Sequence, residues 1–390
     1  MKAVILAAGE GRRLRPLTAV RPKPMVPIAN RPLLERVVTA VADAGIDEIV
    51  LVVGYKRERI QNYFGDGDDW DVDIEYAIQD KQLGTGHAVL QAAAHIEDDF
   101  LVLNGDRIIE PTAIRDVREH DDEDTVVMSV TRSQEPSRYG VVELDGNRVT
   151  RITEKPPEHT TTSDLINAGV YRFDTDIFAA IQETTTGDDG ELAITATLND
   201  LADAELVCAQ RYQGLWQDVT HLWDVISVNA SVLDRADRDT RVETTARIDP
   251  TATVTDAVAM DRDAAVQPNA TVLRGTAIGE NVRIGPNSVV ANSLVLADAT
   301  IEAGAVVRDA IVGENVRIGA NTTIAGGVGD VVVDGELYPE VRLGGVVGDN
   351  TDLGGAVTVV AGTVIGTGVT VEAGATLDGR IPNDAEVRRG

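Results

Sequence analysis

Residues 248–290 read IDPTATVTDAVAMDRDAAVQPNATVLRGTAIGENVRIGPNSVV, and an apolar side chain returns at every sixth position. The positions are Ile248, Val254, Met260, Val266, Val272, Ile278, Ile284 and Val290. A period of six is neither helical nor a simple strand alternation, and it matches the hexapeptide β-helix, a three-sided coil of parallel strands. Eight consecutive positions make a chance pattern in a valine-rich sequence remote. We therefore predict a left-handed parallel β-helix of hexapeptide repeats.

The same spacing returns after an interruption. It recurs at Val347, Leu353, Val359, Ile365, Val371 and Leu377. Residues 325–346, AGGVGDVVVDGELYPEVRLGGV, break the repeat, and an insertion of this length must leave the coil as a loop or arm. Slips near Leu294 and Val312 indicate corner adjustments. Small residues often follow the apolar position, and we expect them and the glycines at the corners. They are Ala252, Ala264, Ala270, Thr276 and Ser288.

The first half alternates apolar runs with segments of helical spacing. Strands are predicted at residues 4–7, 48–53, 100–103 and 125–130. Pro32 suits the first turn of a helix and Gly45 suits its end. The apolar stripe of that helix is Leu33, Val37, Val38 and Val41. This order predicts a Rossmann-like α/β domain, with a mixed, mostly parallel sheet, helices on both faces, and ligands at the carboxyl ends of the strands.

These patterns divide the chain into three parts. We predict the α/β domain over residues 1–221, a connecting segment over 222–245, and the β-helix over 246–390 with its arm at about 325–346. The connecting segment contains a helix at 222–233 and a polar boundary, RADRDTRVETT.

Composition narrows the function classes. The formal net charge of −29 over 390 residues argues against a nucleic-acid or acidic-membrane surface, because phosphate would be repelled. No apolar stretch could span a bilayer and the N-terminus lacks the pattern of a secretion signal, so we expect a cytoplasmic protein. The acidic, lysine-poor composition is typical of proteins from salt-accumulating archaea, which suggests a halophilic habitat.

The chain opens with MKAVILAAGEGRRLRPLT, in which an apolar run ends at Gly9-Glu10-Gly11-Arg12-Arg13. Glycines let phosphate oxygens approach the backbone N–H groups, but the third glycine of a dinucleotide fingerprint and the Gly-Lys-Ser/Thr of a P-loop are absent. On spacing alone, an ordinary strand-to-helix turn and a phosphate cradle stay equally open.

The continuation favours the phosphate cradle. Lys23 lies in RPKPMVP, residues 21–27, and the prolines of the segment predict a stiff, extended loop that presents Lys23 with little freedom to lose on binding. A solvated surface lysine does not normally need such a setting.

LAAGEGRRLRPLT with RPKPMVPIANRPLLE resembles the signature of the sugar-1-phosphate nucleotidyltransferases. Further family-like pieces follow in the expected order, and with the hexapeptide half the resemblance covers nearly the whole chain. They are QLGTGHA at 82–88, NGD at 104–106, YGVV at 139–142, EKP at 154–156, NAGVY at 167–171 and WQDV at 216–219. The sequence is most similar to two-domain enzymes of the N-acetylglucosamine-1-phosphate uridylyltransferase and glucose-1-phosphate thymidylyltransferase type.

The resemblance implies a reaction and its machinery. A sugar-1-phosphate oxygen attacks the α-phosphorus of UTP or dTTP and pyrophosphate leaves, so positioning and charge neutralisation should supply most of the rate. It implies Arg13 and Lys23 as catalytic cations, although Arg12 and Glu10 depart from the residues of many relatives. Asp106 and Asp218 are implied as ligands of Mg²⁺.

The resemblance also assigns the substrate contacts. Nucleotide binding is implied for Ala8, Gly9, Gly11, Gln79, Gly84 and Thr85. Sugar-phosphate binding is implied for Gly140, Glu154, Lys155 and Asn167. The choices between UTP and dTTP, and between glucose-1-phosphate and N-acetylglucosamine-1-phosphate, stay open because they depend on pocket shape.

Relatives with a hexapeptide domain often carry a glucosamine-1-phosphate acetyltransferase there, which uses a histidine base. This sequence has no histidine after His221 and no lysine after Lys155, so we expect the coil to lack that activity. A structural role is expected instead, with coils packed side by side in a homotrimer. Two alternatives remain, a bifunctional enzyme and a non-catalytic regulatory homologue; the latter would not need both metal carboxylates.

Overall fold

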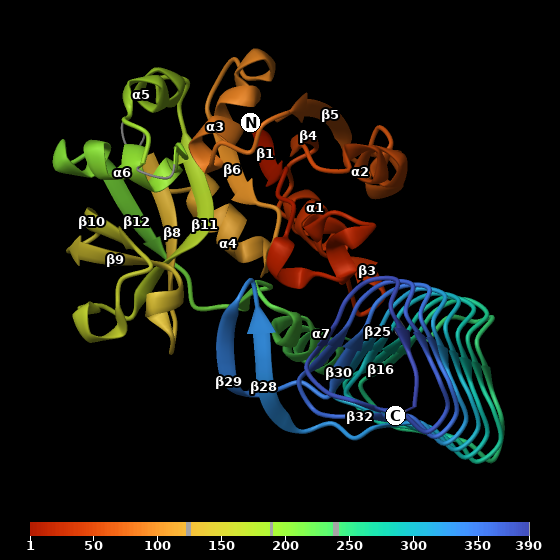
Figure 1. Cartoon of the computed structure of the whole chain (residues 1–390). Helices are drawn as coiled ribbons and strands as arrows, with labels where there is room; N and C mark the ends of the chain where they lie inside the picture. The colour runs from red at the N-terminus through yellow and green to blue at the C-terminus, as the bar shows by residue number, and fades with distance from the viewer. Residues whose placement is uncertain (122–125, 188–189, 237–241, 390) are drawn as a thin grey trace. The chain divides into compact units, whose positions relative to one another are not determined.

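The structure is a computed structural model that describes residues 1–121, 126–187, 190–236 and 242–389 (Figure 1). It divides into two compact units that are not contiguous in sequence. The first unit comprises residues 1–10, 22–25 and 33–218, and the second comprises residues 11–21, 26–32 and 219–390. Two short segments from the start of the chain therefore fold with the C-terminal half, which departs from a simple boundary at residue 221.

The first unit contains a mixed sheet of nine strands within the described residues. In spatial order the strands are β5 (Asp73–Ile78), β4 (Glu48–Val53), β1 (Lys2–Ala7), β6 (Phe100–Asn104), β11 (Leu165–Phe173), β8 (Val126–Arg132), β12 (Val207–Arg211), β10 (Arg148–Glu154) and β9 (Gly140–Asp145). Strands β5, β4, β1 and β6 are parallel, whereas β11 runs antiparallel to β6 and to β8. The predicted strands are confirmed, although residue 125 lies outside the described residues.

Helices cover both faces of this sheet, as predicted. Alternate residues of β1 enter two separate cores: Ala3 and Ile5 belong to one, and Val4 belongs to the other. The first core is covered by α1 (Leu33–Asp43), α2 (Arg57–Phe64) and α4 (Pro111–Arg118). The second is covered by α3 (Thr85–Gln91), α5 (Ile177–Glu183) and α6 (Ile194–Asp203). None of the described helices has both the length and the apolar character that crossing a bilayer requires.

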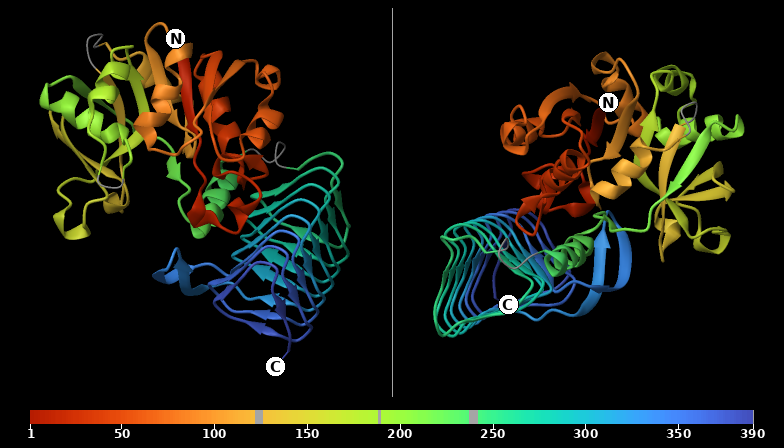
Figure 2. Two further views of the ribbon diagram at one scale, coloured as in Figure 1. Left: turned by 45° about the horizontal axis from the view of Figure 1, so that its top comes forward. Right: turned by 180° about the vertical axis from the view of Figure 1, so that it is seen from behind.

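The second unit contains a coil of three parallel sheets, consistent with a left-handed β-helix (Figure 2). The first sheet is β14 (Arg247–Ile248), β17 (Ala265–Val266), β20 (Arg283–Ile284), β23 (Thr300–Ile301), β26 (Arg317–Ile318), β31 (Asp352–Leu353), β34 (Thr370–Val371) and β37 (Glu386–Val387). The second is β15 (Thr253–Val254), β18 (Thr271–Val272), β21 (Val289–Ala291), β24 (Val306–Arg308), β27 (Thr323–Ile324), β32 (Thr358–Val359) and β35 (Thr376–Leu377). The third is β16 (Val258–Met260), β19 (Thr276–Ile278), β22 (Leu294–Val295), β25 (Ala310–Val312), β30 (Gly345–Val347), β33 (Thr363–Ile365) and β36 (Arg380–Ile381).

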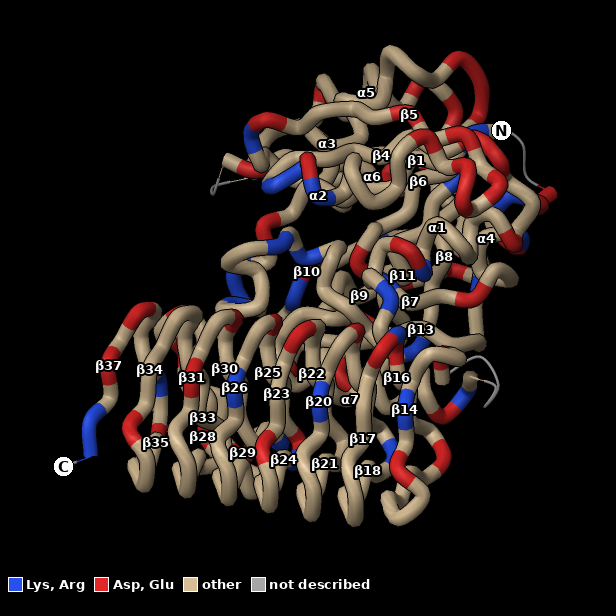
Figure 3. Tube along the Cα trace, turned by 90° about the vertical axis from the view of Figure 1, so that its right-hand side faces the viewer, with Lys and Arg blue, Asp and Glu red and all other residues tan. Residues whose placement is uncertain are grey.

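The six-residue period corresponds to one side of this coil. Val266 pairs with Ile284 in the next coil, and Ile284 pairs with Ile301 in the coil after that. The second coil is thus one residue shorter than the first, which accounts for the predicted slip near Leu294. The repeated apolar side chains fill the interior, except that Ile248 in the first described coil is 42% exposed. The stacked coils carry mostly uncharged residues along their trace (Figure 3).

Asparagine and aspartate turn many corners of the coil, a role that we expected only small residues and glycines to play. They adopt positive φ at Asp263, Asn269, Asn281, Asn287, Asp298, Asn315, Asn321 and Asn350. These two residue types tolerate the left-handed region better than other side chains. The small residues that follow, such as Ala264 and Ala270, are fully buried.

The insertion in the coil is a β-hairpin of β28 (Val328–Val333) and β29 (Glu336–Arg342), within the predicted arm. The predicted connecting helix is α7 (Leu222–Arg235), and part of the polar boundary lies outside the described residues. The segment around Lys23 is not extended as predicted. It forms short 3-10 turns at Arg12–Leu14, Leu17–Ala19 and Lys23–Met25, because the φ that proline imposes also suits a 3-10 turn.

The coil core should respond strongly to truncation. We expect Ile318→Ala, at a fully buried position, to lower the free energy of unfolding of the coil by about 2–5 kcal/mol, because it leaves a cavity in a close-packed interior. Urea denaturation followed by circular dichroism measures the loss. Val360→Ala is the control, since Val360 is 39% exposed and its truncation should cost less than about 0.5 kcal/mol. Equal losses for the two variants would contradict this account of the coil.

Candidate active site

Two aspartates meet at the carboxyl end of the parallel strands. Asp106 follows β6, and Asp218 ends β13 (Trp216–Asp218), which pairs with β7 (Arg107–Ile109) so that Asp218 lies opposite Arg107. One guanidinium nitrogen of Arg107, Nη1, forms an ion pair with Asp218 and lies 3.5 Å from Asp106 Oδ1. Lys23 Nζ donates a hydrogen bond of 2.5 Å to Asp106 Oδ2. The structure therefore brings Lys23, Asp106 and Asp218 together.

The electrostatic interactions within this cluster favour the charged forms of Asp106 and Arg107. Burial raises the pKa of Asp106, but the charges of Arg107 and Lys23 outweigh burial, so its pKa lies well below the usual range. Burial lowers the pKa of Arg107, and the neighbouring charges of Asp106 and Asp218 outweigh it, so its net pKa is raised. Asp106 is therefore ionised at neutral pH and Arg107 is charged.

The donor set fits Mg²⁺. Two carboxylates that share one cationic nitrogen can share a divalent ion, and oxygen ligands are those that Mg²⁺ prefers. Among the described residues no group of three or more histidine, cysteine, aspartate or glutamate side chains could hold a metal. A cation held by the two carboxylates of Asp106 and Asp218 would need water and phosphate oxygens for the rest of its shell, which is the coordination that Mg²⁺ usually has.

The start of the glycine-rich turn lies after β1. Ala8 is buried, and its carbonyl oxygen accepts a hydrogen bond of 2.9 Å from Gln82 Nε2. At Gly9, an added Cβ would meet nothing within 4 Å, so the backbone there is open to a ligand. Gly11, with φ +70°, and the exposed Arg13 belong to the second unit.

The predicted base-reading residues lie at the end of β5 and the start of α3. Gln79 is 4% exposed, and its Nε2 donates to Gly84 O at 3.1 Å and lies 2.9 Å from His87 Nδ1. Thr85 Oγ1 accepts a hydrogen bond of 3.0 Å from the backbone N–H of Ile194. Gln79, Gly84 and Thr85 thus form one connected group.

Packing supplies a reason for glycine at position 84 that the sequence did not reveal. Gly84 has φ +95°, and a Cβ there would lie 2.6 Å from the carbonyl oxygen of Leu192. Only glycine tolerates both the backbone conformation and the contact.

The predicted sugar-binding residues also converge. Gly140 pairs with Glu154 across β9 and β10, and a Cβ on Gly140 would lie 3.1 Å from Glu154 Oε2 and 3.7 Å from Asn167 Cβ. Lys155 follows Glu154 with φ +41°, and the two side chains form a loose, half-exposed ion pair of 4.0 Å. Because β11 is antiparallel to β6, Asn167 near the start of β11 lies at the same end of the sheet as Asp106, which follows the end of β6.

Tyr171 holds Asn167 in place and was missed by the sequence analysis. Its hydroxyl accepts from Asn167 Nδ2 at 2.7 Å, and Asn167 Oδ1 accepts from the backbone N–H of Gly169 at 3.0 Å. Burial raises the pKa of Tyr171 to about 12, with a smaller lowering by Asn167, so the phenol stays neutral. The NAGVY motif contained this partner, four residues after Asn167.

Arg107 and Trp216 were also missed. Trp216 Nε1 donates to Ala168 O at 2.8 Å, and its ring meets Tyr139 edge-on at 5.0 Å and lies 5.4 Å from the Arg107 guanidinium. This contact set connects the aspartate pair to the strand that carries Asn167. The position of Arg107 directly after Asp106 was the only signal in the sequence.

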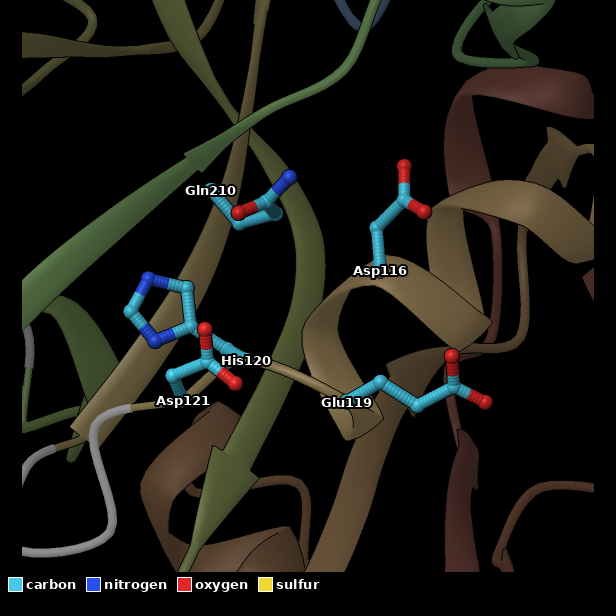
Figure 4. A pocket seen from close by; sticks show the side chains of 5 residues that line it. All are labelled: Asp116, Glu119, His120, Asp121 and Gln210. Atoms are coloured by element: carbon cyan, nitrogen blue, oxygen red, sulfur yellow. The ribbon is translucent and has the colours of Figure 1, made fainter.

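A surface depression lies elsewhere in the first unit. Its lining is Asp116, Glu119, His120, Asp121 and Gln210, and it contains none of the predicted site residues (Figure 4). Three carboxylates would repel a triphosphate, so the depression does not compete with the aspartate pair as a nucleotide site.

Comparison with known families identifies the family to which this fold belongs. The family described as Nucleotidyl transferase matches residues 2–235, and the one described as GMPPB C-terminal domain matches residues 254–383. The chain belongs to the nucleotidyl transferase family. Asp106 and Asp218, the charged pair described above, lie within the matched span of this family.

Several curated relatives of this nucleotidyl transferase have named functions. It is 39% identical over 236 residues to bifunctional protein GlmU of Methanococcus maripaludis, covering 60% of this chain and 55% of that protein. It is 37% identical to the low-salt glycan biosynthesis nucleotidyltransferase Agl11 of Haloferax volcanii, covering 60% and 66% of the two chains. It is 36% identical to glucose-1-phosphate thymidylyltransferase of Streptomyces antibioticus, covering 63% and 69%. The chain thus spans only about half of the GlmU relatives.

A solved structure shares the nucleotidyl transferase fold. A crystal structure from Bacillus anthracis, assigned to a glucose-1-phosphate thymidylyltransferase with bound sucrose, matches with a TM-score of 0.56 and 26% identity. The match covers 61% of this chain and 97% of that chain.

Proposed function

We propose that this nucleotidyl transferase moves a nucleotidyl group from UTP or dTTP to glucose-1-phosphate or N-acetylglucosamine-1-phosphate and releases pyrophosphate. The observation that carries the proposal is the meeting of Asp106 and Asp218 on one nitrogen of Arg107, with Lys23 beside them. Two carboxylates and two cations in one place suit a triphosphate with its divalent metal.

The proposed reaction depends mainly on how the protein positions the sugar phosphate and the nucleotide. An oxygen of the sugar phosphate is already ionised at neutral pH, so it attacks the α-phosphorus without a general base, and the bond to the leaving pyrophosphate breaks. The protein must hold the two phosphates in line and neutralise the charge that accumulates on the transferring group. We assign this role to Lys23 and Arg13, with the backbone of Ala8, Gly9 and Gly11 as the phosphate cradle.

Asp106 and Asp218 would hold Mg²⁺, which polarises phosphate oxygens and neutralises negative charge when bound. Lys23 Nζ and Arg107 Nη1 form ion pairs with the oxygens of these carboxylates. A divalent ion held by Asp106 and Asp218 would compete for the same oxygens and would leave both cationic side chains available to phosphate. The charges of these four side chains, two positive and two negative, sum to zero before any substrate binds.

We assign substrate recognition to two groups of residues, one around Gln79 and one around Glu154. Gln79 uses its Nε2 toward Gly84 and His87, so its Oε1 is the atom that would accept from the N3–H of a pyrimidine. Gly140, Glu154 and Asn167 would bind sugar hydroxyls, with Lys155 on the sugar phosphate. The carboxylate of Glu154 can accept from two hydroxyls at once.

A pyrophosphate-release assay tests the proposed reaction. The full chain is incubated with Mg²⁺, each of the nucleotides UTP, dTTP, CTP and ATP, and several sugar-1-phosphates, at molar salt because of its net charge of −29. We expect release only when a nucleotide and a sugar phosphate are both present, and fastest with UTP or dTTP. Release that does not depend on any sugar phosphate would overturn the proposal.

The coil should not transfer acetyl groups. The sequence has no histidine after His221 and no lysine after Lys155, so the coil lacks a base with a pKa near neutrality. We expect no release of coenzyme A above background from acetyl-CoA and glucosamine-1-phosphate, measured with a thiol reagent. Detectable acetylglucosamine-1-phosphate in this assay would restore the bifunctional alternative.

We also propose that the coils associate as a homotrimer, since flat hexapeptide coils commonly pack side by side. Multi-angle light scattering after gel filtration at molar salt should then give three times the chain mass of 41.5 kDa, or a multiple of that value. A single-chain mass across the micromolar range would contradict this proposal.

A further inference from the structure

The segment that carries the phosphate-binding residues is divided between the two units. Residues 11–21 and 26–32 belong to the unit of the coil, whereas Lys23, two residues after Arg21, belongs to the unit of the sheet. The part of the chain around Lys23 is therefore flanked on both sides by segments that are packed on the β-helix.

Arg21 is the first anchor. Its side chain is 3% exposed, and its Nη2 lies 2.9 Å from Asp349 Oδ2 and 2.8 Å from Glu314 Oε1. Asp349 is 2% exposed and follows β30, and Glu314 follows β25, the strand that pairs with β30. The Asp349 Oδ1 atom also accepts from the backbone N–H of Glu314 at 2.8 Å. One guanidinium is thus fixed to two adjacent coils.

Arg21 also holds the turn that precedes it. Its Nη1 donates to the carbonyl oxygen of Leu17 at 3.1 Å, and the next residue, Thr18, donates from Oγ1 to the carbonyl oxygen of Gly11 at 2.8 Å. Thr18 is fully buried. The ion pair on the coil is therefore connected through two hydrogen bonds to Gly11, a residue of the proposed phosphate cradle.

A second anchor holds the far side of Lys23. Residues Ala29 and Asn30, both at positive φ, form the tip between β2 (Pro27–Ile28) and β3 (Arg31–Pro32). The Ala29 N–H donates to Asn229 Oδ1 at 2.8 Å, and Asn229, fully buried on α7, donates to Gly275 O at 2.9 Å. Asn30 Nδ2 donates to Ile278 O in β19 at 2.9 Å.

Stability alone does not explain the first anchor. Removing two charges from water costs about as much as their attraction returns, so a buried ion pair contributes little net stability and is more useful for fixing one geometry. A loop that presents N–H groups and cations to a triphosphate must keep one geometry. Small displacements of such a loop, even those caused at a distance from the reacting atoms, lower the rate strongly.

We propose that the β-helix sets the conformation of the nucleotide-binding segment, and that Arg21, held by Asp349 and Glu314, is the positioning residue through which it does so. The role of the coil then extends beyond assembly, and nucleotide binding depends on Glu314 and on Asp349, which lies 328 positions from Arg21 in the sequence. This inference rests on the proposed function only in assigning that segment to the triphosphate.

The test compares Arg21→Gln with Arg317→Gln in the full chain. Arg317 likewise pairs with two carboxylates, those of Glu302 and Asp352, but on the exposed side of the coil, so its variant removes an ion-pair pattern of the same kind without touching the segment. We expect Arg21→Gln to raise the Kd for UTP with Mg²⁺, and the KM for the nucleotide, about 10- to 100-fold. The KM for the sugar phosphate should change less than about twofold, and Arg317→Gln should resemble the wild type.

Two further variants keep the test decisive if Arg21→Gln fails to fold. Asp349→Asn preserves size and leaves Glu314 as a counter-ion, and Arg21→Met with Asp349→Leu removes both buried charges together. Thermal unfolding reports whether the coil is intact. The inference is supported if the double variant is folded and its affinity for UTP is lower than that of the wild type. It is overturned if the variants are folded and their nucleotide affinity is unchanged. If the variants bind UTP weakly but the wild type shows no turnover, the result counts against the proposed reaction and not against this inference.

Discussion

Asp218→Asn is expected to lower kcat for nucleotidyl transfer by about 100- to 1,000-fold, the cost of losing one preorganised charge at the reacting phosphates. Asparagine keeps the size of the side chain but removes the charge that pairs with Arg107 Nη1 and that would bind the metal with Asp106. The KM for the sugar phosphate should change little, because Glu154 and Asn167, the residues proposed to bind the sugar, form a separate group. Initial rates of pyrophosphate release measure the effect.

The same variant should need more metal. The Mg²⁺ concentration that gives half-maximal rate should rise about tenfold or more, since one of the two proposed protein ligands is lost. Asp116→Asn is the matched control, because Asp116 lines the depression on α4 and lies outside the predicted site. If Asp218→Asn and Asp116→Asn turn over equally, the aspartate pair is not the metal site and the proposed function loses its main support.

Lys23→Met is expected to lower kcat/KM for the nucleotide by about 100-fold or more. Methionine keeps the length of the side chain and removes the charge that now lies 2.5 Å from Asp106 and that would neutralise the triphosphate. Removing this cation also leaves Asp106 with Arg107 as its ion-pair partner among the described residues. Steady-state kinetics with varied nucleotide, at saturating sugar phosphate, separate the loss in kcat from the loss in affinity.

Lys2→Met provides the control for this loss. Lys2 begins β1, at the opposite end of the strand from Ala8, and its ion pairs with Glu48 and Glu75 lie on the surface. Its kinetics should stay within about twofold of the wild type, because exposed pairs contribute about 0–1 kcal/mol to stability and nothing to the site. A Lys23→Met enzyme as active as Lys2→Met would show that Lys23 serves only the ion pair with Asp106.

Several elements were predictable from local pattern. The six-residue period gave the coil, because every apolar side chain in a hexapeptide repeat meets the same environment in successive coils. Alternating apolar runs and helical spacing predicted the sheet and the helices on both faces. The structure confirms the predicted apolar stripe of α1, because Leu33, Val37, Val38 and Val41 are all buried. The corner positions of Asn and Asp could also have been predicted, since they recur with the period of the coil.

The site was predictable only in part. The resemblance supplied Asp106 and Asp218 as a pair, but the intervening Arg107 was visible only as a neighbour of Asp106. Its role depends on the pairing of β7 with β13, which joins residues far apart in the chain. Tyr171 and Trp216 were likewise hidden, because their contacts with Asn167 and Ala168 arise from strand register and close packing.

By itself the sequence determined the two kinds of architecture, the insertion in the coil and the residue types of the site, because periodicity and motif order are local properties of the chain. Only the tertiary structure decided that residues 11–21 and 26–32 fold with the coil, and that Arg21 is paired with Asp349 and Glu314. The physical reason is that a buried charge must find its counter-ion wherever the fold brings one close, and sequence distance places no limit on that partner.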